Sequence, residues 1–365
     1  MDYASRYLSL EEPKRADHLW RYTPWKRVHP SGDVTEVPEL GKPSLSLFSM
    51  DGNEVPDGIR LIEGEVRQRD QPDSYELTNA FLLASSECSK WTLEVDKKFS
   101  SESPIVLEIQ TGGGSSACHI SLEVGGRSEL ELVTRVVGDS EWFGLLRTGM
   151  RGEGAILNDV LLGLQERGTM LRTDSISVGR DAQVRAGTVS SGSERTKADL
   201  RYSMRDLGGS VRVLGSILSA DSMHLDHHIE IHHDAPETFS RLSWHSACGG
   251  KSRTVGTGML RVSDGAKGTD AAQIFHNLLL SNDAEADSIP ELEVMEHDVV
   301  GCGHGTANGP IDEDQIFYLE SRGLDRQDAK RALIAAFLNS TLSEMGSEQL
   351  HGWLVGVLSR QLESL

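Results

Sequence analysis

The middle of this chain, from Pro104 to about Val300, shows almost no helical periodicity. It consists of short segments of alternating apolar and polar residues, such as "IVLEIQT", "HISLEVG" and "SVRVLGSIL", separated by Gly, Asp and Ser. Such alternation is typical of β-strands bounded by turns. A run of strands this long must satisfy its backbone hydrogen bonds as a sandwich, a barrel or a solenoid.

The spacing of the turns favours the solenoid. The strands recur at irregular short intervals, with glycines and small polar residues at the corners, and this stretch lacks the Asn-Gly pairs that mark tight hairpins. We therefore predict a mainly β fold, a parallel β-helix whose rungs stack Val, Ile and Leu inward. A hairpin-built sandwich or barrel remains the alternative on texture alone.

The helical period returns after Gly309. Asp312 is placed to cap a helix that ends before Gly323, and further helices are expected from about Arg326 and from about Ser347. We divide the chain into an N-terminal mixed or helical cap region (1–100), a parallel β-helix core (101–305) and a C-terminal helical domain (306–365).

Charge and composition exclude several classes of partner. The chain has 56 acidic and 36 basic residues, a formal charge of −20, and no segment that gathers Lys and Arg into a stripe. Nucleic acid and anionic membranes are therefore poor partners. There is no apolar leader and no long apolar run, so we expect a soluble cytoplasmic protein. The four cysteines lie far apart, which favours neither a disulfide framework nor a closed zinc site.

One candidate metal site lies in the histidine-rich stretch "MHLDHHIEIHHDAPETFS". On a strand, His228, Glu230, His232 and Asp234 would share one face, and imidazole with carboxylate suits zinc or ferrous iron. This pattern would serve a stand-alone metal-dependent enzyme. The alternative is a solvated strand face with adventitious metal affinity, and the absence of an HExxH spacing favours it.

A second candidate site lies in "GCGHGTANGP", residues 301–310. Cys302 and His304 are two residues apart, so an extended backbone would place both side chains on one face. A thiolate and an imidazole could supply two metal ligands, the others coming from another chain. The alternative is a turn whose glycines take positive φ and whose cysteine is a small buried hydrophobe. No phosphate-binding loop motif is present, so no nucleotide site is expected.

Residues 270–324 resemble the SufB/SufD family of iron–sulfur cluster assembly proteins. The motifs that match are "TDAAQ", "NLLLS", "C-x-HG" and "D-x-x-Q-x-FYL-x-SRG", and upstream "HDAPETFS" and "WRYTP" agree as well. The resemblance implies a right-handed parallel β-helix between helical regions. It also implies a complex with a SufC-type ABC ATPase and a second family member.

Within that family the chain resembles the SufD branch. The scaffold cysteine and glutamate of the SufB branch fall here on Phe275 and Gly305, whereas the important histidine of the SufD branch falls on His304. The resemblance thus implies a non-enzymatic subunit that holds no cofactor tightly by itself and shares a transient iron or Fe–S cluster with a partner. Gly256 departs from the family pattern, which has a bulky residue there.

The resemblance also suggests two interfaces. One would join this chain to a SufB-type scaffold, or to a second copy of itself, with His304 and Cys302 at the contact. The other would dock the ATPase on Phe317, Tyr318, Leu319 and Arg322, unless their apolar surface packs internally instead. Besides the metal-dependent enzyme, a homodimeric structural β-helix protein is the remaining alternative.

Overall fold

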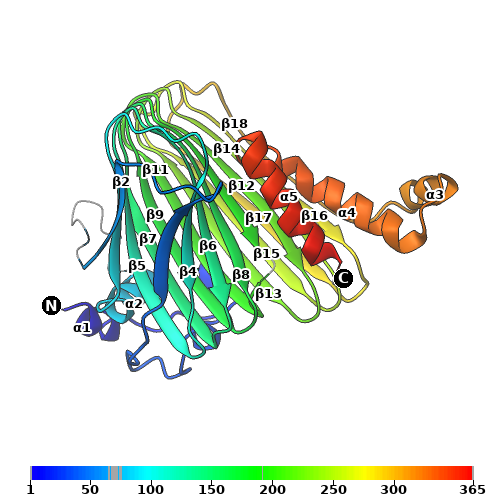
Figure 1. The fold of residues 1–365 in the computed structure, drawn as a ribbon, viewed down its shortest axis with the longest axis horizontal. Coiled ribbons are helices and arrows are strands. Elements are labelled where there is room, and N and C mark those ends of the chain that lie inside the picture. Colours follow the sequence, from blue (N-terminus) through cyan, green and yellow to red (C-terminus); the bar gives the residue numbers. More distant parts are fainter. Residues whose placement is uncertain (1, 65, 67–72, 74–75, 191, 364–365) are drawn as a thin grey trace.

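The fold is a flattened solenoid of two facing β-sheets (Figure 1). The computed structural model describes residues 2–64, 66, 73, 76–190 and 192–363. The described residues form two sheets of nine strands each, and the chain alternates between the two sheets at almost every step. The predicted mainly β fold, with a parallel solenoid core and C-terminal helices, is confirmed.

The first sheet, which we call the helix-covered wall, contains the even-numbered core strands. In spatial order it comprises β1 (Ser44–Ser49), β4 (Ile105–Gln110), β6 (Glu129–Gly138), β8 (Ile156–Gln165), β10 (Gln183–Ser190), β12 (Ser210–Ser219), β14 (Phe239–Cys248), β16 (Asp270–Leu279) and β18 (Gly301–Pro310).

The second sheet, the cap-covered wall, contains the odd-numbered core strands. From the same end it comprises β2 (Ile59–Glu63), β3 (Lys90–Val95), β5 (Ser115–Val124), β7 (Trp142–Arg151), β9 (Thr169–Val178), β11 (Arg195–Met204), β13 (His224–His233), β15 (Arg253–Val262) and β17 (Glu285–Val294). Both walls are parallel throughout, except that β1 pairs antiparallel with β4 and β2 pairs antiparallel with β3.

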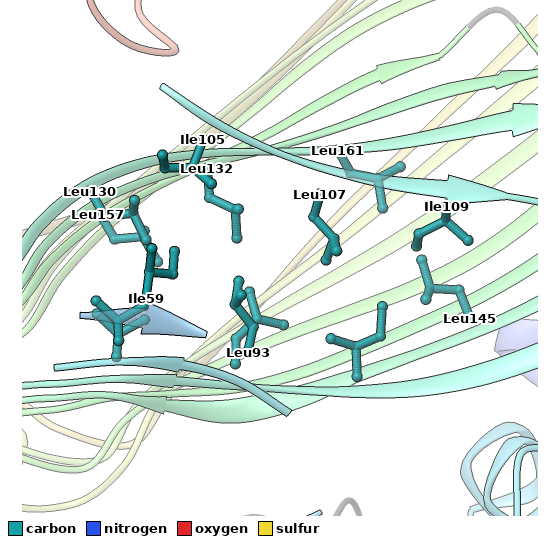
Figure 2. Packing of buried hydrophobic residues seen from close by; sticks show 14 of the residues in the cluster. Ile59, Leu93, Ile105, Leu107, Ile109, Leu130, Leu132, Leu145, Leu157 and Leu161 are labelled. Atoms are coloured by element: carbon teal, nitrogen blue, oxygen red, sulfur yellow. The ribbon is translucent and has the colours of Figure 1, made fainter. Parts of the chain in front are cut away.

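The lumen between the walls is filled by the inward-facing side chains of successive strands. Figure 2 shows this packing near the N-terminal end, where Ile105, Leu132 and Leu157 of one wall face Leu93 and Leu145 of the other. Parallel pairing in register stacks the same side-chain position from rung to rung, so one apolar column continues into the next. The alternating segments of the sequence are the cause of this core.

The lumen also contains paired charges. Arg172 and Asp174, both inward on β9, are buried, and Nη2 of Arg172 lies 2.5 Å from Oδ2 of Asp174. Arg147 on β7 is buried and forms an ion pair with Asp159 of the opposite wall. Although burial alone would raise it, the charges of Arg147 and Arg172 hold the pKa of Asp174 below its usual value. Each of these four buried charges thus lies beside an opposite one.

Separate layers cover the outer faces of the two walls. The N-terminal cap contains α1 (Tyr3–Leu8), two short 3-10 turns, η1 (His18–Trp20) and η2 (Trp25–Arg27), and α2 (Leu77–Ser85), and it packs on outward residues such as Trp142 and Leu171. The helices α4 (Arg326–Leu342) and α5 (Glu348–Leu362) cover the other wall, as Figure 1 shows. In the part of the chain that the structure describes, no helix is both long enough and apolar enough to span a membrane.

The first C-terminal helix, α3 (Glu313–Ser321), begins and ends as its sequence predicts. The Asp312 side chain accepts a hydrogen bond from the backbone N–H of Asp314 at 2.9 Å. At the other end Gly323 has φ +101°, and the backbone N–H groups of Gly323 and Leu324 donate to the carbonyls of Glu320 and Leu319. The solenoid itself runs to Pro310, so the boundary expected at 305/306 lies inside β18.

Phe275 on β16 and two glycines of β15 pack together near the C-terminal end of the lumen. A Cβ atom added to Gly256 would lie 2.7 Å from Cδ1 of Phe275, and one added to Gly258 would lie 2.9 Å from the same ring. The ring is buried and occupies the space that side chains at these positions would need. The unusual glycine at position 256 is therefore explained by a large neighbour across the lumen.

This packing predicts a coupled pair of substitutions. Gly256→Val should lower the free energy of unfolding by about 1–3 kcal/mol through overpacking, and Phe275→Ala by about 3–5 kcal/mol through a cavity. The loss in the double variant should be smaller than the sum of the two single losses by a coupling of about 0.5–3 kcal/mol. Urea unfolding of the four proteins measures this, and strictly additive losses would contradict the contact.

Candidate functional site

The solenoid ends in an uncovered rung made of β17 and β18. Each is the last strand of its wall, and among the described residues no further strand pairs with the outer edge of either. Both are ten residues long, so two full edges of backbone N–H and C=O groups face outward from this end. Among the described residues, no further rung of strands closes the lumen beyond β17 and β18.

Cys302 and His304 both point to the lumen from this last rung, at the open end of the solenoid. Cys302 is in register with Ala271 of β16, and His304 with Gln273, both of which are buried in the lumen. The prediction that the cysteine and the histidine share one face of an extended segment is confirmed. The alternative, a glycine-built turn, is wrong, because residues 301–310 form a regular strand and none of its described glycines has a positive φ.

The glycines of this strand lie on its outer face, away from the lumen. Gly303, Gly305 and Gly309 alternate with the inward residues, and an added Cβ at any of the three would meet nothing within 4 Å. The side of β18 away from the lumen is therefore flat and bare. The chemical groups of the strand are concentrated on the lumen side.

The environment of Cys302 disfavours its thiolate. The side chain is half-buried against the lumen core. This burial, together with the negative charge of Asp270, raises the pKa of the Cys302 thiol above its usual value. Without a metal or another cation, the thiol remains largely protonated at neutral pH.

Polar side chains form the floor beneath the site. Two of the lumen-facing residues of β16 are amides. The side-chain nitrogens of Gln273 and Asn277 donate hydrogen bonds across the lumen to β17. Asn277 also donates to Oδ1 of Asn308 on β18 at 2.7 Å. The last rung is thus tied to the one below it by side-chain amides as well as by the backbone ladder.

The histidine-rich stretch forms β13, and its outward face is a closed ion-pair network. His228 Nδ1 lies 3.0 Å from Oδ1 of Asp199, and His232 Nε2 lies 3.1 Å from Oε2 of Glu230. The guanidinium of Arg201 lies among these carboxylates, with its Nη2 2.9 Å from Oδ2 of Asp199. A fixed cation therefore occupies the position between carboxylates that a metal ion would require.

Asp234 does not join this group. It follows β13 and accepts a hydrogen bond from the Ser263 hydroxyl at 2.6 Å.

The ion-pair network also keeps Asp199 ionised. Although burial alone would raise it, the Arg201 charge and the hydrogen bond from His228 hold the pKa of Asp199 below its usual value. Among residues 2–64, 66, 73, 76–190 and 192–363, no group of three or more His, Cys, Asp or Glu side chains is placed to hold a metal ion.

The residues expected to dock a partner lie on α3, which projects away from the solenoid at the right of Figure 1. Phe317 and Tyr318 are 73% and 56% exposed, whereas Leu319 is half-buried. Arg322 is exposed and its guanidinium lies 5.1 Å from the Tyr318 ring centroid. Internal packing therefore does not account for the two aromatic rings.

The sequence analysis missed Gln273, which lies directly beneath the site, and Asn277, which ties the last rung to the one below it. Their signal is present in the sequence, since both amides lie at inward positions of a strand whose equivalents one rung earlier include Leu242. Only the register shows that Gln273 lies below His304. The fold and this end thus define a solenoid protein whose terminal rung carries thiol and imidazole groups on an uncovered face.

Comparison with known proteins agrees with this class. The family model described as SUF system FeS cluster assembly, SufBD core domain, matches residues 108–337. An iron–sulfur cluster assembly SufBD family protein of Mycobacterium leprae is 26% identical over 366 residues, covering 97% of this chain and 91% of that protein. The iron–sulfur cluster assembly protein SufD of Escherichia coli is 42% identical over 102 residues, which are 27% of this chain and 24% of that protein. The chain belongs to the SufBD family.

The environment of Cys302 predicts a pH dependence. Because a raised pKa leaves less thiolate at a given pH, alkylation of Cys302 by iodoacetamide should be slower at pH 7.5 than that of a free thiol with a pKa of about 8.5. The rate should still be rising above about pH 9. The measurement is mass spectrometry of the Cys88→Ser variant, which removes the exposed cysteine.

Asp270→Asn supplies the control for this profile. Removing the carboxylate charge should move the alkylation curve to lower pH, because Asp270 contributes to the raised pKa. A plateau below pH 8 in the protein with Asp270 intact would contradict the assigned environment.

Proposed function

We propose that this chain is a SufD-like, non-enzymatic subunit of a SUF iron–sulfur cluster assembly complex. It pairs through its open end with a SufB-type scaffold, docks a SufC-type ATPase on α3, and helps iron enter the nascent cluster. The observation that carries the proposal is that Cys302 and His304, whose side-chain types can bind iron, both point to the lumen from β18 at the open end of the solenoid. The local likeness to the E. coli protein supports the SufD branch.

The donor set is suited to iron as cargo. Thiolate and imidazole are soft to borderline ligands that bind iron and zinc, and tetrahedral sites of this kind use four donors. Two donors from this chain leave the remainder to a partner that faces the same end. Metal binding would also deprotonate the Cys302 thiol, offsetting the effect of burial on its pKa.

The edges of β17 and β18 provide a means of pairing. An exposed strand edge is a template for another strand, whose main chain supplies the affinity. A partner that adds strands here would cover the lumen face and enclose the two side chains. The site would thus form only on assembly.

The projecting α3 supplies the second interface. Exposed aromatic rings dominate the energetics of protein interfaces when a partner buries them. Because α3 follows β18 in the chain and projects from the same end of the solenoid, an ATPase docked there would lie beside the scaffold contact and could transmit movement to it and to α4. The nucleotide chemistry would belong to that partner.

Assembly and iron uptake are tested together. The purified chain is mixed anaerobically with the SufB-type and SufC-type proteins of its own source, and the mass of the product and its bound Fe²⁺ are measured. His304→Ala should leave the mass unchanged and lower the affinity for iron at least about 10-fold, as expected for loss of a ligand.

His232→Ala is the matched control, since this half-buried histidine lies on the outward network of β13. It should bind iron as the unchanged protein does. A homodimer that associates with neither partner protein would refute the proposal. A loss of iron affinity in His232→Ala but not in His304→Ala would favour the metal-dependent enzyme instead.

The α3 interface has its own prediction. Phe317→Ala should change the free energy of unfolding by less than about 0.5 kcal/mol, because the ring is exposed, yet weaken ATPase binding by about 2 kcal/mol or more. Calorimetry of unfolding and of binding measures the two effects. Phe48→Ala, on an exposed ring of β1, should weaken neither interaction with the partners, and equal binding by all three proteins would exclude α3 as the docking site.

A further inference from the structure

Gln273 is a fully buried polar residue directly below the proposed site. Its exposed fraction is 0%, it points into the lumen from β16, and it is in register with His304 on the adjacent strand. Adjacent strands in a sheet lie about 4.8 Å apart. The two side chains are therefore neighbours on the same face.

The nitrogen of this amide is used as a brace. Nε2 of Gln273 donates a hydrogen bond to the backbone carbonyl of Glu291 on β17, at 2.8 Å. The side chain thus crosses the lumen and joins the two walls immediately beneath the open rung. It holds β17, one strand of the open rung, against β16, the strand that pairs with the strand of His304.

The oxygen of the same amide has no partner. Among the described residues, no donor reaches Oε1 of Gln273 although the atom is buried. It lies against Gly258, where an added Cβ would be only 2.0 Å away, so the glycine leaves room for the amide. A buried carbonyl oxygen without a donor is destabilising and needs an explanation.

Packing does not supply that explanation. At the same register one rung earlier, the helix-covered wall has Leu242, which is buried and apolar. Leucine at this register fills the lumen one rung earlier and leaves no orphaned oxygen. Gln273 therefore places an amide at a lumen position where the preceding rung has an apolar side chain.

The chemistry of histidine ligands suggests a use for the oxygen. A metal-bound imidazole almost always donates its second ring N–H to a carbonyl or carboxylate, which fixes the orientation of the ring. No hydrogen bond to the His304 ring is found within the described part of the chain. One side chain lacks an acceptor and its neighbour in register lacks a donor.

We propose that Gln273 is a positioning residue for His304. Rotation of the amide brings its carbonyl oxygen from Gly258 toward β18, where it accepts the ring N–H of His304 when iron occupies the other ring nitrogen, and the same rotation releases the amide nitrogen from the Glu291 carbonyl. This inference rests on the proposed function and adds to it a residue that touches the ligand rather than the iron. Iron here is the cargo of the assembly, shared with the partner.

Asn277 provides a matched control. It lies four residues along the same strand, faces the same lumen and also crosses to β17, donating to the Ser288 hydroxyl at 2.8 Å. Its register partner is Asn308, not His304. Loss of either amide removes a tie between the walls, but only loss of Gln273 removes the acceptor.

The test uses the anaerobically assembled complex of the full chain with its scaffold and ATPase partners. The dissociation constant for Fe²⁺ is measured by competition with a chromogenic chelator, for the unchanged protein and for Gln273→Leu, Gln273→Glu and Asn277→Leu. We expect Gln273→Leu to weaken iron binding about 10–100-fold. Asn277→Leu should stay within about 3-fold, and Gln273→Glu should keep most of the affinity because it retains an acceptor oxygen.

Calorimetry of each variant separates this role from a structural one. Comparable losses of thermal stability in Gln273→Leu and Asn277→Leu, with iron affinity lost only in the first, would support the inference. Equal iron losses in both variants would overturn it. Should Gln273→Leu fail to fold, Gln273→Glu decides, since weak iron binding in that folded variant would equally overturn the role of the oxygen.

The result also distinguishes failure of the inference from failure of the proposed function. If His304→Ala weakens iron binding and Gln273→Leu does not, the inference alone is wrong. If neither variant changes the iron affinity, the proposed function fails and the inference falls with it.

Discussion

A parallel ladder of backbone hydrogen bonds satisfies each strand only when another strand lies beside it. In this protein the ladder continues in both walls from β3 and β4 to β17 and β18, and there it stops. The last rung leaves two ten-residue strand edges unpaired, and edges of this kind promote pairing with other chains. Cys302 and His304 lie on this last rung, so the surroundings of the candidate site depend on where the ladder stops.

The sequence was informative wherever one physical rule decided the outcome. Alternating segments with small corner residues predicted the solenoid, because side chains of a strand alternate between its faces. Asp312 and Gly323 predicted the limits of α3 for equally local reasons. The spacing of Cys302 and His304 predicted a shared face, since an extended backbone requires it.

The sequence misled where neighbours distant along the chain decided the outcome. The glycines of residues 301–310 suggested a turn, but strand pairing with β16 holds them extended. The face of β13 that includes His228 resembled a ligand set, yet Arg201 on the adjacent strand already neutralises its carboxylates. Gln273 was missed although an amide at an inward strand position is a signal, because only the register places it beneath His304.

The two ends of the solenoid differ, and the difference sets a limit on assembly. At the N-terminal end the walls finish in β1 and β2, which are only six and five residues long and run antiparallel to their neighbours. A ten-residue edge from another chain would find no matching edge there, so head-to-tail addition is disfavoured. Contact through strand edges would therefore join like end to like end and close at two chains, which would protect an edge-exposing protein against growth into filaments.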